Sequence, residues 1–415
     1  MTLPPRPKIA YLLSEYPGVS HTFFLREIQA LRQRGLLIQT ASINSVLEPP
    51  DGFSSAERAE CAQTYYIKSG SRLAAGFRVL AIAAANPGVM LRGLHEVFQL
   101  DPWNPRATIF ALFYFAEALL LGQWMRKQKC SHLHVHFAGA VATVAMIAAA
   151  AWRIPYSMTV HGPDDFYHVD TYYLRRKAER ALFVFCISNF CRSQLVRLVA
   201  HDLWHKFHVC PLGVDETIFF PEPRPANDSF RLVSVGRLHP SKGQSVLLHA
   251  VKQLVDRGFA LHLDLIGGGV DRANLDRIVD EEHLTSCVTL HGALSNSSTR
   301  ALLQGADLFV LSSFAEGVPV ALMEAMAKEI ACVGTVVGGI SELIRSGEEG
   351  ILVAPSSVEE LRDAVAYLIE HPERRLEMAK AGRTKVLAKY NLARNAILQA
   401  GIFAQYGLEG GADDH

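Results

Sequence analysis

The chain has 415 residues, of which 49% are hydrophobic and 20% are charged. This length is long for one hydrophobic core and predicts two domains, and the composition is typical of a compact soluble protein rather than a disordered one. The formal net charge is zero, and we expect no nucleic acid partner.

The charge is unevenly distributed along the chain. Residues 1–200 hold 21 Lys and Arg against 13 Asp and Glu, whereas residues 201–415 hold 20 against 28. A basic first half indicates contact with something anionic, such as the inner face of a membrane or a lipid-linked phosphate. The alternative is that the split carries no information about partners.

The cysteines and the apolar segments bear on location. The seven cysteines are odd in number and form no close Cys-x-x-Cys pair, which favours free thiols in a reducing cytoplasm. The N-terminus contains no apolar signal region. Residues 109–124 and 138–152 are apolar but short or interrupted for a bilayer span, so we expect buried helices there.

The chain opens with an expected strand at residues 8–14 and an expected helix at residues 23–34, which Gly35 ends as a C-cap. The turn between them contains a glycine and lies at the carboxyl end of the strand, where α/β folds bind ligands. Its candidate ligand contacts, which offer hydroxyl, imidazole and backbone donors, are Gly18, Ser20, His21 and Thr22.

Residues 48–130 give the least specific prediction of structure and function in the sequence. Basic residues such as Arg72, Arg78 and Arg126 alternate with apolar residues such as Phe77 and Phe113. Such a pattern fits helices that lie on an anionic membrane, or packed helices with solvated ends, and we favour the packed helices.

Three histidines follow in one expected strand, His132-Leu-His-Val-His-Phe-Ala. Alternate residues share a side, so His132, His134 and His136 lie on one face. Metal ligation is one interpretation, because imidazole is a common metal ligand. We expect no metal, since no carboxylate or cysteine partner is obvious nearby.

The strand expected at residues 156–160 ends in His161-Gly-Pro-Asp-Asp. A histidine and carboxylates at the carboxyl end of a strand can polarise or orient sugar hydroxyls, which makes His161 and the carboxylates after it candidates. A histidine that only caps the core is the alternative. Further strands are expected at residues 183–187 and 207–211, and the proline-rich run at 220–228 reads as a linker.

The second half opens with a strand at residues 231–235, a loop from Gly236 to Gly243, and a helix from Gln244. A glycine-bearing loop between a strand and a helix, with one arginine and one lysine, suits a diphosphate. Arg237 can form a fork of hydrogen bonds, and Lys242 adds a point charge. A later strand, at residues 263–266, ends in the glycine cluster that begins at Gly267, which alone is weak evidence for a nucleotide site.

Residues 307–329 carry the most specific pattern. A strand at 308–311, a loop at 312–319 and a helix at 320–328 form a strand that runs into a helix N-terminus, where unpaired N–H groups can bind an anion. Glu316 in the loop and Glu324 in the helix can hydrogen-bond the hydroxyls of that anion's substituents. The arrangement therefore suits a phosphorylated sugar.

The stretch Glu316-Gly-Val-Pro-Val-Ala-Leu-Met-Glu-Ala-Met-Ala resembles the signature of the retaining GT-B glycosyltransferases grouped as family four. The resemblance implies that Glu316 lies beside the donor sugar and that Glu324 binds the nucleotide ribose. Gly236-Arg-Leu-His-Pro-Ser-Lys-Gly is similar to the family's phosphate loop, which gives that role to Arg237 and Lys242. Further donor contacts that we expect are Gly18, Gly236, Gly267, His291, Gly292, Gly317, Val318 and Pro319.

The first half resembles the exopolysaccharide and colanic-acid-type members of that family. Their first loop reads Tyr-Pro-x-x-Ser-Glu-Thr-Phe, and here His21 stands in place of the glutamate. By the same resemblance His136 lies at the interdomain cleft and His161 contacts the donor sugar or the reacting hydroxyl, with Asp164 after it. The neighbouring Pro163 and Asp165 depart from the subgroup, which leaves the path of that loop open.

The resemblance implies an α/β fold with two Rossmann-like domains that face each other across a cleft, the GT-B fold. We expect an acceptor-binding domain at 1–213, a nucleotide-sugar-binding domain at 214–390, and a C-terminal helix at 391–415 that crosses back to the first domain. The implied activity is transfer of a sugar, with retention, from a UDP- or GDP-sugar to a glycan or lipid-linked acceptor, with no cofactor and no metal. His161, Arg237, Lys242 and Glu316 are the expected catalytic residues.

Two other functions fit a sugar-nucleotide site of this kind. A nucleotide-sugar epimerase of similar architecture would release a changed sugar without any acceptor. A non-catalytic sugar-nucleotide-binding subunit of a polysaccharide assembly complex would bind the donor and transfer nothing. The presence of both Glu316 and Glu324 argues modestly against the second.

Overall fold

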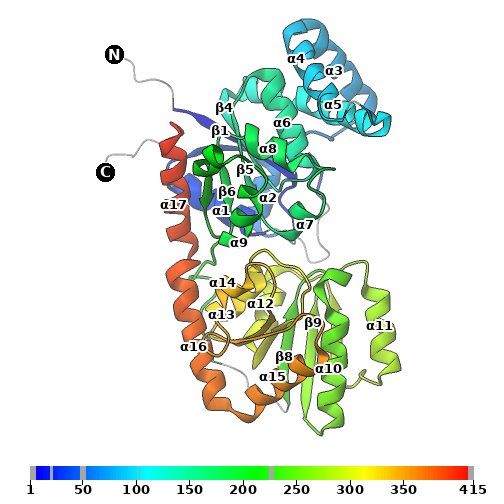
Figure 1. Ribbon diagram of the computed structural model, residues 1–415, viewed down its shortest axis with the longest axis vertical. Helices are drawn as coiled ribbons and strands as arrows, with labels where there is room; N and C mark the ends of the chain where they lie inside the picture. Colours follow the sequence, from blue (N-terminus) through cyan, green and yellow to red (C-terminus); the bar gives the residue numbers. More distant parts are fainter. Residues whose placement is uncertain (1–5, 19–21, 47–52, 102, 224–228, 410–415) are drawn as a thin grey trace. The chain divides into compact units, whose positions relative to one another are not determined.

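The structure, a computed structural model, describes residues 6–18, 22–46, 53–101, 103–223 and 229–409. The chain divides into two compact units. Met1–Cys210 with Ala393–His415 form the first unit, and Pro211–Leu392 form the second. Each unit is a parallel β-sheet with helices packed around it (Figure 1), so the fold is the predicted α/β fold with two Rossmann-like units.

The sheet of the first unit contains seven strands among the described residues. They are β1 Lys8–Glu15, β2 Leu37–Asn44, β3 Tyr65–Tyr66, β4 Cys130–His136, β5 Tyr156–Val160, β6 Val184–Cys186 and β7 Phe207–Val209. Their order is β3-β2-β1-β4-β5-β6-β7, and every neighbouring pair is parallel. The direction of winding reverses between β1 and β4, which is the switch point at which such sheets bind ligands.

Alternation along β4 explains how this sheet is covered on both faces. Leu133 and Val135 point into one apolar core, which the helices between β3 and β6 cover. His132 and His134 point to the other face, where Phe403 packs against them. The helices of the first unit are α1 Thr22–Gln33, α2 Ser55–Gln63, α3 Arg72–Ala85, α4 Pro87–Phe98, α5 Pro105–Gln128, α6 Ala140–Trp152, α7 Pro163–Tyr167, α8 Leu174–Arg180, α9 Asn189–Val196, η2 His201–Lys206 and α17 Leu392–Gln405.

The expectation of a buried helix at residues 109–124 is wrong for its first half. α6 is buried as expected, and so are Leu119 and Leu121 of α5, but Phe110 and Phe113 are 54% and 63% exposed. Ala111 and Phe115 in the same half are 2% and 4% exposed, and the Phe115 ring packs on Gly93 of α4. The first half of α5 therefore buries one side and exposes the other.

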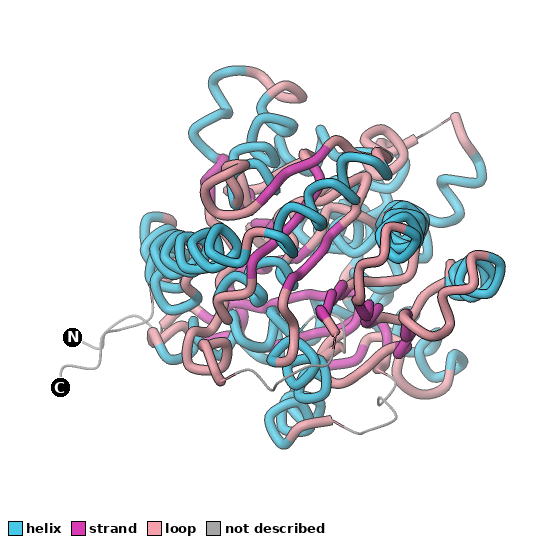
Figure 2. The backbone as a smooth tube through the Cα atoms, turned by 90° about the horizontal axis from the view of Figure 1, so that it is seen from below, coloured by secondary structure: helices cyan, strands magenta, loops and turns pink. Residues whose placement is uncertain are grey.

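The second unit repeats the same winding. Its described strands are β8 Phe230–Val235, β9 Leu261–Ile266, β10 Val288–Gly292, β11 Leu308–Leu311, β12 Ala331–Thr335 and β13 Ile351–Val353, in the order β10-β9-β8-β11-β12-β13. Here the switch point lies between β8 and β11. Its helices are η3 Pro240–Lys242, α10 Gln244–Asp256, α11 Arg272–Glu281, α12 Asn296–Gln304, α13 Val320–Ala327, α14 Ile340–Leu343, α15 Val358–Glu370 and α16 Pro372–Lys389. Figure 2 shows the strands in magenta with helices on either side.

Most predicted elements of the second half begin or end within a few residues of the observed ones. The strand at 308–311 and the start of α10 at Gln244 agree with the prediction. All seven cysteines are free, as expected.

The loops at the carboxyl edge of the second sheet are held together by backbone contacts at glycines. Gly236 N donates to the Ile266 carbonyl at 2.9 Å, and Gly267 N donates to the Gly292 carbonyl at 2.8 Å. A Cβ atom on Gly267 would lie 1.9 Å from the Gly236 oxygen, and one on Gly338 would lie 1.8 Å from the Glu316 oxygen. Only glycine permits such an approach, so these glycines fix the shape of the edge.

We expect Gly338→Ala to destabilise the protein more than Gly258→Ala. Both glycines have left-handed φ angles, +52° and +88°, but a Cβ on Gly258 meets nothing within 4 Å. The control, Gly258→Ala, should therefore lower the free energy of unfolding by only the strain of the left-handed backbone, about 1–2 kcal/mol. Gly338→Ala adds a backbone clash of about 1–3 kcal/mol. Thermal unfolding by scanning calorimetry measures the difference, and equal losses in the two variants would contradict it.

Candidate functional site

The switch point of the second unit brings two of the predicted loops together. Residues 236–243 follow β8 and residues 312–319 follow β11, and β8 pairs directly with β11. Phe314 N in the second loop donates to the Ser241 carbonyl in the first at 2.8 Å. The Ser312 hydroxyl donates to the Lys242 carbonyl at 3.2 Å. The two loops therefore form one continuous surface at the carboxyl edge of the sheet.

Lys242 and Glu316 meet on this surface. Lys242 Nζ lies 2.6 Å from Glu316 Oε1, and the Ser313 hydroxyl donates to the same oxygen at 2.7 Å. The Glu316 side chain is 9% exposed and the Lys242 side chain 18%. A buried carboxylate needs such a partner, and the ammonium group has three N–H donors, of which Glu316 accepts one. The pair can thus hold the lysine in place for an anion.

The other predicted residues of this loop pair lie around that ion pair. Arg237 is exposed at the end of β8, and its carbonyl accepts a hydrogen bond from Gln244 Nε2 at 2.9 Å. Buried residues Gly317, Val318 and Pro319 lead into α13. Glu324 is half-buried on α13. The arrangement matches what an anion with a polar substituent requires, namely a helix N-terminus, cations and carboxylates at one edge.

His291 and Gly292, at the end of β10, belong to the same edge. His291 Nε2 lies 2.7 Å from Asp264 Oδ1, and Arg231 Nη2 lies 2.9 Å from Asp264 Oδ2. Burial alone would raise the pKa of Asp264, but the hydrogen bonds from His291 and Arg231 lower it below its usual range. Asp264 is a single carboxylate inside the apolar strand β9, and no local pattern in the sequence marks it. It fixes the orientation of His291.

In the first unit the predicted histidines His136 and His161 are in contact. His136 Nδ1 lies 3.0 Å from His161 Nε2, and His136 Nε2 lies 3.3 Å from Glu27 Oε1 on α1. Phe24 packs against both rings, with ring centroids 4.5 Å from His136 and 5.5 Å from His161. His136 is completely buried, whereas His161 is 8% exposed at the end of β5. Of these two histidines, His161 is the better placed to reach a ligand.

Asp165 connects the loops that follow β4 and β5. Its carboxylate accepts hydrogen bonds from the backbone N–H groups of Ala138 at 2.8 Å, His161 at 3.0 Å and Gly162 at 3.4 Å. Lys177, also buried, donates from Nζ to the Ala138 carbonyl at 2.7 Å. Burial lowers the pKa of Lys177 to about 7, against the opposing charge of Asp165. Burial likewise raises the pKa of Asp165, against its three backbone hydrogen bonds.

The predicted cleft residue Asp164 is exposed on α7, and its neighbour Asp165, for which no separate role was predicted, is the buried one. A local signal could have found Asp165. Pro163 occupies the first turn of α7, which makes Asp165 the third residue of that helix, where a carboxylate reaches back to the preceding backbone N–H groups. No comparable signal marks Lys177, a lysine on the buried side of α8.

The remaining predicted residues of the first unit are described only in part. Gly18 is buried in the described part of the loop that follows β1. Thr22 is the first residue of α1. Ser20 and His21 lie outside the described residues.

The three histidines of β4 behave as core residues. The Ser157 hydroxyl lies 2.7 Å from both His132 Nε2 and His134 Nδ1, and the Thr159 hydroxyl lies 2.9 Å from His134 Nε2. Burial lowers the pKa of His132 to about 3. Within the described ranges, no group of three His, Cys, Asp or Glu residues is placed to hold a metal ion.

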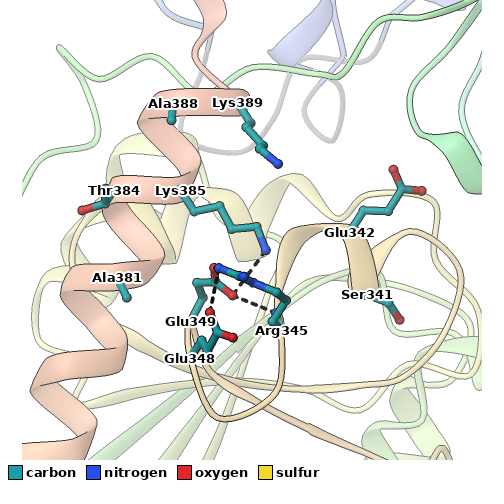
Figure 3. A pocket seen from close by; sticks show the side chains of 10 residues that line it. All are labelled: Ser341, Glu342, Arg345, Glu348, Glu349, Ala381, Thr384, Lys385, Ala388 and Lys389. Atoms are coloured by element: carbon teal, nitrogen blue, oxygen red, sulfur yellow. Dashed lines mark hydrogen bonds and ion pairs between the residues drawn. The ribbon is translucent and has the colours of Figure 1, made fainter.

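A surface hollow elsewhere in the second unit contains none of the predicted residues (Figure 3). Its centre is buried Glu349, which accepts hydrogen bonds from Arg345 N at 2.8 Å and Arg345 Nη2 at 2.9 Å and lies 3.3 Å from Lys385 Nζ. Burial alone would raise the pKa of Glu349, but Arg345 and Lys385 lower it. This network fastens α16 to the loop before β13. Its role is structural.

Comparison with known proteins agrees with this architecture. Residues 72–217 match the glycosyltransferase family 4 model, and residues 215–385 match the model for glycosyl transferases group 1. The chain is 26% identical over 408 residues to the colanic acid biosynthesis glycosyltransferase WcaL of Escherichia coli, covering 92% of this chain and 96% of WcaL. It is 27% identical over 281 residues to the teichuronic acid biosynthesis glycosyltransferase TuaC of Bacillus subtilis, covering 64% and 68%.

Two solved structures share the fold. Sucrose-phosphate synthase from Thermosynechococcus elongatus superposes with a TM-score of 0.75 at 18% identity, covering 97% of this chain and 99% of that one. HepE from Anabaena, in complex with UDP-glucose, superposes with a TM-score of 0.72 at 16% identity, covering 96% and 99%. The two family models show that the chain belongs to the glycosyltransferases, and the two solved structures show that its fold is the GT-B fold.

We expect Asp165→Asn to destabilise the first unit by about 3 kcal/mol, because it leaves buried Lys177 without a counter-charge and places an amide N–H₂ among backbone N–H groups. The exposed neighbour Asp164→Asn is the matched control and should change stability by less than about 0.5 kcal/mol. All four tryptophans lie in the first unit, so their fluorescence in a urea titration follows this unit. Equal stability of the two variants would show that the carboxylate does not hold these loops.

Proposed function

We propose that this glycosyltransferase moves a sugar, with retention of its anomeric configuration, from a UDP- or GDP-sugar to a glycan or lipid-linked acceptor. The proposed pathway is synthesis of an exopolysaccharide or another cell-surface polysaccharide. The observation that carries the donor assignment is the Lys242–Glu316 ion pair at the switch point of the second unit. The polysaccharide assignment is supported by the names of the relatives WcaL and TuaC.

In this proposal the donor diphosphate lies at the carboxyl edge of the second sheet. Arg237 forms a fork of hydrogen bonds to phosphate oxygens, and Lys242 supplies a charge beside them. Glu316 faces the sugar, and Glu324 accepts hydrogen bonds from the ribose hydroxyls. The backbone of Gly236, Gly267 and Gly292 provides a surface without side chains, to which the nucleotide can approach closely.

The chemistry consists mainly of stabilising the leaving group. The bond between the anomeric carbon and the phosphate oxygen breaks, and the electron pair stays on the diphosphate, beside Arg237 and Lys242. The acceptor hydroxyl attacks the anomeric carbon from the same face, and its proton passes to the departing phosphate oxygen. His161 orients a sugar hydroxyl or the reacting hydroxyl, and Glu27 and His136 hold the His161 ring in position.

We further propose that the protein works in the cytoplasm at the inner face of a membrane, where lipid-linked acceptors are found. The excess of basic residues in the first half supports this location, because anionic headgroups attract such a surface.

Lys242→Ala should lower turnover about 10²-fold to 10³-fold, because one stabilising cation is missing from the transition state. Release of nucleoside diphosphate from UDP- and GDP-sugars, with a membrane lipid extract as the acceptor, measures it. The control is Lys252→Ala, whose lysine pairs with Asp256 on the surface of α10. Lys242→Ala also leaves buried Glu316 without its cation, so thermal unfolding is measured on both variants and turnover is compared at a temperature at which both are folded. Wild-type turnover in Lys242→Ala would remove the assignment.

A further inference from the structure

Helices α3, α4 and α5 of the first unit present large apolar side chains to solvent. Phe77 is 72% exposed, Leu91 is 71% exposed and Phe113 is 63% exposed, and Trp103 between α4 and α5 is 93% exposed. Figure 1 shows the three helices grouped at one corner of this unit. Exposed apolar residues in such number mark an interaction surface. We call the exposed side chains of these three helices and of Trp103 the apolar face.

The pattern along α3 shows that this exposure is not a by-product of core packing. Leu73, Phe77 and Leu80 recur at helical spacing and are 77%, 72% and 66% exposed. On the opposite side of the helix, Ile82 is 1% exposed and belongs to the core. A helix between core and water has one apolar side. Because α3 is apolar on both sides, its outer side also needs a partner.

The charges around the apolar face fit an anionic partner. Residues 72–129 contain seven basic and three acidic residues. Two of the acidic residues already have cationic partners. Glu96 Oε1 lies 3.1 Å from Arg176 Nε, and Glu117 Oε1 lies 3.0 Å from Lys68 Nζ. Arg106 on α5 is exposed, and helical spacing places it on the same side of that helix as Phe110 and Phe113.

The geometry argues for a surface contact rather than a membrane span. Among the described residues, α5 alone is by itself long and apolar enough to cross a bilayer, and 44% of its most apolar window is buried inside the unit. α3 and α4 are bent by 110° relative to each other, which prevents them from forming one straight span. Apolar helices with flanking cations lie in the interface of a bilayer.

We propose that the apolar face docks on an anionic lipid bilayer. Its aromatic and leucine side chains enter the boundary between headgroups and acyl chains, and Arg106 lies against lipid phosphates. This inference rests on the membrane contact in the proposed function and specifies its surface, but it does not depend on the transfer reaction.

The test is cosedimentation of the full chain with vesicles of phosphatidylcholine, with and without phosphatidylglycerol. Wild-type protein should partition into the anionic vesicles about tenfold more strongly than into the neutral ones. The double variant Phe77→Ser with Phe113→Ser should lose about tenfold or more of that partitioning. Both side chains are largely exposed, so the variant keeps its core.

The matched control is the double variant Tyr367→Ser with Leu376→Ser, which removes large side chains that are 37% and 50% exposed on α15 and α16 of the second unit. It should bind vesicles like the wild type, and both double variants should bind nucleotide unchanged. Three outcomes overturn the proposal. The wild-type protein binds neither kind of vesicle, or the Phe77 and Phe113 variant cosediments with vesicles like the wild type. In the third outcome, the wild type is a dimer without lipid and the Phe77 and Phe113 variant is a monomer. None of the three bears on the donor site.

Discussion

The contact between Lys242 and Glu316 joins the two loops on which the candidate donor site depends. The loops follow neighbouring strands, β8 and β11, and the chain leaves these two strands toward opposite edges of the sheet, so the loops enter different helices, α10 and α13. A carboxylate at 8% exposure would be costly to bury alone, and a lysine beside it would be mobile alone. Together they are fixed at 2.6 Å, and the ammonium keeps donors for an anion.

In the first unit a buried carboxylate, Asp165, likewise joins two loops. Asp165 binds backbone N–H groups of two loops and thereby positions His161, while the fully buried Lys177 holds the carbonyl side of the same loop. In both units a buried charge at the carboxyl edge fixes loops that carry exposed polar groups. Rigid loops place their side chains before the ligand arrives, which reduces the cost of binding.

Much of the second unit could be predicted from the sequence, because its signals are local. The apolar run at 308–311, the proline before α13 and the glycine before α10 each mark a boundary within a few residues. The Lys242–Glu316 contact could not be derived from spacing, since 74 positions separate the two residues and only the pairing of β8 with β11 brings them together. Buried Asp264 and Lys177 were missed for the same reason, because tertiary contacts create their environments.

Less of the first unit could be predicted from the sequence. The interleaving of basic and apolar residues between 48 and 130 fits both packed helices and membrane contact, and packed helices are the favoured prediction. The structure shows helices that pack on one side and expose apolar residues on the other, as α3 does with Ile82 and Phe77. The helical period of apolar residues could not show which side is buried and which is exposed, because both sides are apolar.

The measurement that tests the central claim most directly is calorimetric titration of the purified protein with UDP, GDP, ADP and NAD, repeated on Glu324→Ala. Glu370→Ala, at the exposed end of α15, is the control for loss of a surface carboxylate. A donor site at the carboxyl edge of the second sheet predicts selective binding of one nucleoside diphosphate that weakens strongly in Glu324→Ala and not in the control. Binding of NAD alone, or equal binding by wild type and Glu324→Ala, would contradict it.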